Sequence, residues 1–320
     1  MGKAVCLSQT SCYRWVDEFK NGREDITDEP RSGRPVDVST PDTVAKVEKL
    51  IKSDRRLTID DVAETLDISH GTAHNIVHEK LAFNKVSARW VPKMLTDDHK
   101  ALRVMAAREC MRRLRLEGDA FLSRIVTTDE TWVYHYEPES KRQSMEWKHT
   151  ASPVKKKFKS QRTTRKVMLT VFWDRQGPIT LDFKSQGNNV NSQNYCELLA
   201  VVKQDIKNKR RGLLSRGVVF HQDNARPHTA ARTMAKIEEL GWEVLVHPPY
   251  SPDLAPSDFH LFGPLKNHMR GKHFTTDAAV IEAVRKWFRT QSPEFYSAGI
   301  QNLVGRWNKC IEKEGDYVEK

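Results

Sequence analysis

Three aspartates stand at positions from which their carboxylates could converge. Asp129 and Asp223 each follow a short apolar run that is typical of a buried strand, and Asp258 lies at the start of a predicted helix. Carboxylates at neighbouring strand ends and a helix start can bind two Mg²⁺ ions, because this metal prefers hard oxygen ligands and accepts further ones from a phosphate. Two such ions activate an attacking water or hydroxyl and stabilise the leaving oxygen. The pattern therefore indicates phosphoryl-transfer chemistry that needs no side-chain nucleophile.

Simpler interpretations of these acids stay open on the residues alone. Asp129 could be a solvated strand end, and Asp223 could form an Asx-type turn with its own backbone. Asp258 could favour the positive end of a helix. Asp253, in the stretch SPDL, is interpreted as a turn acid.

Three histidines offer a different ligand set. His221 and His228 flank Asp223, and His247 ends the next predicted strand. A site built from histidines and a carboxylate would indicate a hydrolase that uses zinc or another transition metal.

Composition narrows the class of partner. The 320-residue chain is long enough for two domains and carries a formal net charge of +11, with a pI near 9.4. Such a basic excess indicates a polyanionic partner, with nucleic acid ahead of a membrane surface. The five cysteines are scattered and include no C-x-x-C pair, which favours a reducing compartment over a disulfide framework. No apolar run reaches the roughly 18 residues of a membrane span, so we expect no membrane partner and no secretory signal.

The aspartates that follow strands need a sheet to hold them. Strand patterns stand at 123–136, 166–177, 178–183, 218–222 and 243–247, with helix patterns over 192–208, over 228–240 and from Ser257 onward. Strands come first and then alternate with helices. This order is typical of an α/β domain in which helices cover a mixed sheet.

The sequence before these strands is helical. Thr40 followed by Pro41 is a good helix start, and residues 57–81 hold two short amphipathic patterns joined by a tight turn. This arrangement is typical of a helix-turn-helix, whose second helix enters a major groove. The outward-facing candidates for DNA contact are His70, Thr72, His74 and Asn75. The alternative is a small helical bundle with a solvated face.

Three further segments complete the pattern. Residues 7–25 fit one amphipathic helix, and a long charged helix is predicted over 96–116. The Gly-, Pro- and Arg-containing stretch 29–37 could place Arg31 or Arg34 in a minor groove. A plain flexible linker is the alternative.

A basic segment separates the first two strong strands. Residues 141–166 carry ten Lys or Arg against one Glu and show no sustained periodicity. Runs of like charge are usually solvated, but a long loop inserted in a compact domain is more often functional. Candidates for phosphate contacts in this loop are Lys155, Lys156 and Lys157.

Four segments resemble the mariner branch of the Tc1/mariner DNA transposases, and the resemblance covers nearly the whole chain. They are WVPKML (90–95), TTDETW (127–132), HQDNARPHTA (221–230) and YSPDLAPSDFHLF (250–262), of which the last is the most specific. The 34 residues between Asp223 and Asp258 also match the spacing of the mariner catalytic triad.

The resemblance implies an RNase H-like catalytic fold and a role for each acid. Asp129 would be the metal ligand shared by two ions, and Asp223 and Asp258 would be the second and third ligands. The implied cofactor is Mg²⁺, with Mn²⁺ as a substitute. The histidines would not bind metal, and we interpret them as strand-end and turn packing with phosphate contacts.

The resemblance also implies the activity of a cut-and-paste transposase. Such an enzyme binds its element's inverted repeats, hydrolyses phosphodiesters at the ends and joins the freed 3′-hydroxyl to target DNA, at a TA dinucleotide in this family. The implied partners are double-stranded DNA and a second copy of the chain, and the implied location is the nucleus. The basic loop resembles the clamp loop that helps to pair two subunits. Trp147 and Phe158 would anchor it against the partner's linker around Trp90.

The implied domains are a remnant of a first helix-turn-helix (1–28), a linker (29–39), a second helix-turn-helix (40–82), an interdomain linker with the long helix (83–118) and the RNase H-like domain (119–320), which includes a clamp-like loop at 138–166. The first helix-turn-helix departs from the family pattern because only its last helix is present. Thr128 stands where a Gly or Cys often precedes the first Asp. The truncation leaves two alternatives: a non-catalytic or domesticated protein that only recognises repeat DNA, and a stand-alone metal-dependent DNA nuclease.

Overall fold

The computed structural model describes residues 8–27, 39–88, 90–149, 152–153, 156–158, 160–187 and 191–318. The chain divides into two compact units, Met1–Trp90 and Val91–Lys320. The predicted groove contacts Arg31 and Arg34 and the loop residue Lys155 lie outside the described residues.

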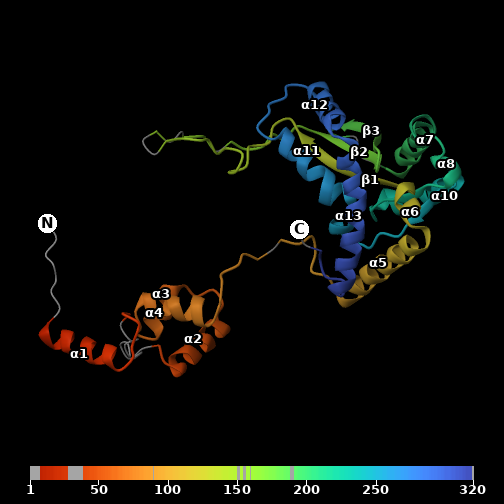
Figure 1. Ribbon diagram of the computed structural model, residues 1–320. Helices are drawn as coiled ribbons and strands as arrows, with labels where there is room; N and C mark the ends of the chain where they lie inside the picture. The colour runs from red at the N-terminus through yellow and green to blue at the C-terminus, as the bar shows by residue number, and fades with distance from the viewer. Residues whose placement is uncertain are drawn as a thin grey trace. The chain divides into compact units, whose positions relative to one another are not determined.

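One mixed sheet organises the second unit (Figure 1). Its strands are β1 (Ile125–Tyr134), β2 (Lys166–Asp174), β3 (Gly177–Ser185), β4 (Val219–His221) and β5 (Glu243–Leu245), in the order β3-β2-β1-β4-β5. The first three strands pair antiparallel, whereas β4 pairs parallel with both β1 and β5. The predicted mixed sheet is therefore confirmed. Because β4 runs parallel to β1 and pairs with its first residues, the residues that follow β4 lie beside the middle of β1.

Both faces of the sheet are buried, because successive side chains of a strand point to opposite faces. On β1, Ile125 joins one hydrophobic cluster and Val126 the other. Helices α7 (Ser192–Lys209), α8 (Leu213–Arg216) and α10 (Ala231–Glu239) supply the cluster around Val126. The Ile125 face is covered by α5 (Asp97–Glu117), α6 (Asp119–Arg124), α11 (Phe262–Met269), α12 (Asp277–Thr290) and α13 (Pro293–Glu312), as Figure 1 shows.

Several boundaries differ from those that the sequence predicts. Helix α6 occupies 119–124, so the strand expected from 123 begins at Ile125; Phe121 and Leu122 are buried in its single turn and a half. The helix expected over 228–240 is two helices, α9 (Arg226–Thr229) and α10, separated by the extended residue Ala230. Helix α5, which the sequence assigns to the interdomain linker, packs against α13 inside the second unit.

The first unit contains the expected helix-turn-helix. Helices α2 (Pro41–Ser53), α3 (Ile59–Thr65) and α4 (His70–Asn75) are followed by a π-helical turn, η1 (Ile76–Lys80). Thr40, Thr58 and Ser69 cap the three α-helices with their hydroxyls. The core holds Val47, Val62, Ala73, Ile76 and Val77, so the predicted inward register is confirmed.

Helix α1 (Gln9–Lys20) is amphipathic, and Trp15 stacks on Phe19 with ring centroids 5.5 Å apart. None of the side chains described for this helix is buried. Among the described residues, no helix is both long and apolar enough to cross a bilayer.

Candidate active site

The register of the parallel strands brings two of the three aspartates to one edge. The ladder between β1 and β4 ends at the pair Thr127 and His221. Asp129 and Asp223 each lie two residues beyond that pair, on chains that run side by side in the same direction. The two residues are close enough for the charge of Asp223 to act on the carboxyl of Asp129.

Asp129 continues within β1, where it pairs with Val171 of β2, and its Oδ1 accepts a hydrogen bond from the backbone N–H of Glu130 at 2.8 Å. Burial raises the pKa of Asp129 well above its usual value, and the negative charges of Asp258, Glu130 and Asp223 raise it further. The site thus gathers more negative charge than its own hydrogen bonds offset.

Asp223 is held by two donors. Its Oδ1 accepts the backbone N–H of Ala225 at 3.0 Å, which is the Asx turn foreseen as a simpler interpretation, and it also accepts from His228 Nδ1 at 2.5 Å. Burial acts to raise the pKa of Asp223, but the hydrogen bonds from His228 and Ala225 outweigh it and the pKa lies below its usual value. Asp223 is therefore ionised at neutral pH.

Asp258 is carried by a π-helical turn, η3 (Ser257–Leu261), that leads into α11. The residue as a whole is exposed. Protein atoms nevertheless exclude enough water from its carboxyl to raise the pKa of Asp258 to about 6; Lys266 opposes this rise and Asp223 adds to it. The structure therefore brings all three predicted acids within the range of one another's charge.

His228 links two of the carboxylates around the site. Its Nδ1 donates to Asp223, and its Nε2 forms an ion pair with Glu130 Oε1 at 3.4 Å. Burial disfavours the charged ring, but the two carboxylates outweigh it and raise the pKa of His228 to about 9. Tyr195 packs on the ring with centroids 4.3 Å apart.

The sequence interpretation treated His228 as turn packing and did not single out Glu130. A signal was available, since Glu130 is adjacent to the first acid and His228 is five residues after the second. The other two histidines do pack at strand ends: His221 Nδ1 lies 2.9 Å from Thr127 Oγ1, and its Nε2 lies 3.1 Å from His247 Nδ1.

The donor set fits a hard divalent cation. The three predicted ligands are carboxylates. Burial is the main reason for the raised pKa of Asp129 and of Asp258, and the negative charge of neighbouring acids raises both pKa values further. A cation at this position would relieve the repulsion between these charges. Within the described part of the chain, no three His, Cys, Asp or Glu side chains lie together in an arrangement that could already hold a metal ion.

The predicted DNA contacts of the first unit lie along α4. His70, His74 and Asn75 are exposed, whereas Thr72 is half-buried and its hydroxyl lies 2.9 Å from Ser69 Oγ in the helix cap. Thr72 is thus already engaged in capping. The exposed polar face suits a groove contact, which stays a prediction.

The basic loop presents its aromatic residues to solvent. Trp147 and Phe158 are 105% and 93% exposed, so neither ring is packed against the part of the chain that the structure describes. Lys156 is exposed, and Lys157 forms an ion pair with Glu139 at 2.9 Å.

Comparison with known proteins decides the family. The mariner Mos1 transposase of Drosophila mauritiana is 33% identical over 310 residues, which cover 96% of this chain and 87% of that protein. The chain belongs to the mariner transposase family. The family model described as "Transposase (partial DDE domain)" matches residues 137–216, between the first and second aspartates. The human histone-lysine N-methyltransferase SETMAR is 35% identical over 308 residues; the chain spans 43% of that protein's length.

Solved mariner structures support the fold. The Mos1 paired end complex with Mn superposes with a TM-score of 0.83 at 31% identity, covering 98% of this chain and 90% of that one. The catalytic domain of the Mos1 mariner transposase gives a TM-score of 0.61 at 32% identity, covering 72% of this chain and all of that one. The RNase H-like fold expected for the second unit of this mariner transposase is confirmed.

Proposed function

We propose that this mariner transposase cuts and joins DNA at a site where Asp129, Asp223 and Asp258 hold divalent metal. The observation that carries the proposal is the register of β1 and β4, which offers Asp129 and Asp223 at matching positions beyond Thr127 and His221. Asp258 adds its charge to the same place, because it is the strongest of the carboxylate neighbours that raise the pKa of Asp129. The chemistry is hydrolysis of phosphodiesters at the element's ends, followed by transfer of the freed 3′-hydroxyl to target DNA.

The metal would be Mg²⁺, with Mn²⁺ as a substitute. Mos1 complexes have been solved with each of these metals, and another Mos1 structure is a strand transfer complex. When bound, the cation would activate the attacking oxygen and stabilise the charge on the leaving one. Asp129 would be the ligand shared by two ions, with Asp223 and Asp258 as one further ligand each.

The surrounding residues orient these ligands and bind the substrate. His228 fixes the rotamer of Asp223 and, through Glu130, ties it to the strand that carries Asp129. Partners of metal ligands act in this way by locking the ligand's orientation. The lysines of the basic loop would bind phosphates of double-stranded DNA, and the exposed face of α4 would read the inverted repeats.

Two further features belong to the proposal. The two exposed aromatics of the basic loop would pack on a second copy of the chain, so the DNA complex contains a homodimer. We also propose a nuclear location, because the substrate would be chromosomal DNA, and TA as the target dinucleotide.

The test is a cleavage assay on DNA that carries the element's inverted repeats, with Mg²⁺ or Mn²⁺. The parent should cut at the repeat ends only when metal is present. Asp223→Asn should abolish cleavage while it leaves repeat binding nearly unchanged. Binding without cleavage by the parent would favour the non-catalytic, domesticated alternative. Cleavage that ignores the repeats would favour a stand-alone nuclease.

A further inference from the structure

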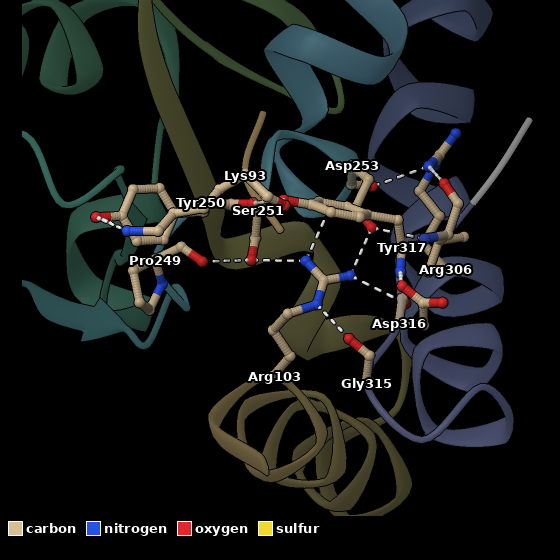
Figure 2. Close-up of polar contacts among 11 residues, drawn as sticks. Lys93, Arg103, Pro249, Tyr250, Ser251, Asp253, Arg306, Gly315, Asp316 and Tyr317 are labelled. Carbon is tan, nitrogen blue, oxygen red and sulfur yellow. Dashed lines mark hydrogen bonds and ion pairs between the residues drawn. The ribbon is translucent and has the colours of Figure 1, made fainter. Parts of the chain in front are cut away.

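A buried arginine joins three distant parts of the second unit just upstream of Asp258. Arg103 projects from α5 and is fully buried, and Figure 2 shows it among residues of the 249–253 loop and of the C-terminal segment. A buried guanidinium is costly unless all its donors are paired. The contacts that surround Arg103 therefore show how strongly its position is fixed.

All five N–H donors of Arg103 have acceptors. Its Nε donates to Gly315 O at 2.7 Å, and Nη1 donates to Ser251 Oγ at 2.6 Å. The two terminal nitrogens form a fork on the Asp253 carboxylate at 2.8 and 2.6 Å, and Nη2 also reaches Asp316 O at 3.3 Å. A bidentate pair of this kind fixes orientation as well as distance. We call Arg103, Ser251, Asp253 and residues 315–318 the Arg103 hub.

The C-terminal segment and α13 add further hydrogen bonds to Asp253. The backbone N–H of Val318 donates to Asp253 Oδ2 at 2.7 Å, and Arg306 Nη1 donates to Asp253 O at 2.8 Å. Tyr317 donates its hydroxyl to Lys93 O or Tyr250 O, which lie 3.0 and 3.1 Å away (Figure 2).

Gly315 makes this closure sterically possible. Its φ is +88°, and a Cβ at this residue would lie 2.2 Å from Lys100 O on α5. Only glycine combines this backbone conformation with so close an approach. The backbone of the C-terminal segment at Gly315 therefore packs directly against the backbone of α5, close to Arg103.

The turn that the hub holds leads directly to Asp258. Asp253 is in the 3₁₀ turn η2 (Pro252–Leu254), and the next residue outside it, Ala255, accepts the backbone N–H of Asp258 at 3.1 Å through its carbonyl. At the residue directly before Asp258, Trp173 Nε1 donates to Ser257 Oγ at 3.0 Å. Two fixed points, the Arg103 hub at Asp253 and the Trp173 contact at Ser257, therefore hold the short segment that leads into Asp258.

We propose that Arg103 is a positioning residue for Asp258, and that residues 315–318 belong to the scaffold of the active site. The hub fixes the η2 turn, and the turn fixes the backbone from which Asp258 extends. This inference rests on the proposed function only for its catalytic consequence; the structural link can be tested without DNA or metal.

The test is hydrogen–deuterium exchange of the full chain, without DNA or metal, read by mass spectrometry on the peptide that covers 254–259. In Arg103→Lys, which keeps the charge but loses the fork, exchange of this peptide should rise roughly tenfold or more relative to the parent. The matched control is Arg113→Lys. Arg113 is a nearly buried arginine of the same helix that forks onto Glu243 at 2.6 and 3.0 Å, and its loss should leave the 254–259 peptide unchanged.

A second variant covers the case in which Arg103→Lys does not fold. A chain that ends at Asp316 keeps the Arg103 fork but loses the Val318 hydrogen bond to Asp253, and its 254–259 peptide should also exchange faster. Repeat-end cleavage should fall by roughly 10–100-fold in both variants, with repeat binding retained. Unchanged exchange at 254–259 in the folded variants would overturn the proposal, as would an equal rise across the whole second unit. If exchange rises locally but the parent itself does not cleave, the hub stands and the proposed function fails.

Discussion

His228 Nδ1 lies 2.5 Å from Asp223 Oδ1, and the opposite nitrogen of the same ring lies 3.4 Å from Glu130 Oε1. One imidazole therefore spans the gap between the chain after β4 and the strand β1. Because the pKa of His228 is raised to about 9, the ring carries both N–H groups at neutral pH and can donate in both directions. Asp223 is thereby held in one rotamer before any ligand arrives.

Replacing His228 should slow catalysis without weakening DNA recognition. In His228→Gln the charged link is lost, so Asp223 samples other rotamers and repeat-end cleavage should fall by roughly 10–100-fold. Single-turnover cleavage and repeat binding measure the two effects separately. His135→Gln is the control, because His135 is equally buried and faces Asp277 at 2.8 Å. Parent-like cleavage in His228→Gln would remove this histidine from the site.

Acid should destabilise the protein through His247. Burial lowers the pKa of His247 to about 4, whereas an unfolded histidine has a pKa near 6.5, so between these values only the unfolded chain binds the proton. The contribution is fully present above about pH 6.5 and is lost as the pH falls toward 4. This difference is worth about 3 kcal/mol.

Urea unfolding of the parent and of His247→Gln at pH 8 and at pH 4.5 isolates the effect. The variant should be less stable than the parent at pH 8, and this gap should shrink in acid. A gap that stays constant between the two pH values would show that His247 does not titrate in this way.

Asn75 should contribute to base recognition. It is exposed on α4 next to the buried core residue Ile76, which fixes the face that it presents. If Asn75 hydrogen-bonds a base edge, Asn75→Ala should reduce the preference for the cognate repeat by about 1–3 kcal/mol. Binding to cognate and random DNA measures the preference, and an equal loss on both would instead assign Asn75 to a phosphate contact.

The basic loop should control the salt dependence of DNA binding. Changing Lys155, Lys156 and Lys157 to Ala should flatten the plot of log affinity against log salt, by about 0.9 for each phosphate that the loop no longer neutralises. Trp147→Ala keeps the charge and should leave this slope unchanged, while it weakens assembly of the two-subunit complex. If both variants bind and assemble as the parent does, the loop is a solvated insertion.

Sequence periodicity was sufficient for the sheet but not for its surroundings. The patterns around Asp129 and Asp223 predicted β1 and β4, because buried strands leave short runs of β-branched and aromatic residues between polar ends. The short helix α6 was missed because six residues are too few to show a helical period, and its last two residues, Ser123 and Arg124, were assigned to the strand. Helix α5 belongs to the second unit because it packs against α13, which lies more than 170 residues later in the chain. Periodicity predicts which face of a helix is buried, but not which helix packs against that face.

The residues of the site also differ in whether the sequence alone predicts them. The three aspartates follow from strand ends, a helix start and a family resemblance, all of which are local signals. Arg103 gives no such signal, since its partners Ser251 and Gly315 are 148 and 212 residues away. The π-helical turn that carries Asp258 was also beyond prediction, because its i→i+5 bonds have no distinct residue pattern.

Binding of Mn²⁺ to the full chain, measured by calorimetry, tests most directly whether the three aspartates hold the metal. The parent should bind, and Asp129→Asn, Asp223→Asn and Asp258→Asn should each lose most of that binding. Asp205→Asn is the matched control, because Asp205 is a partly buried carboxylate of α7 that faces Thr180 and Lys209. It should bind Mn²⁺ as the parent does. Parent-like binding in all three active-site variants would contradict the account.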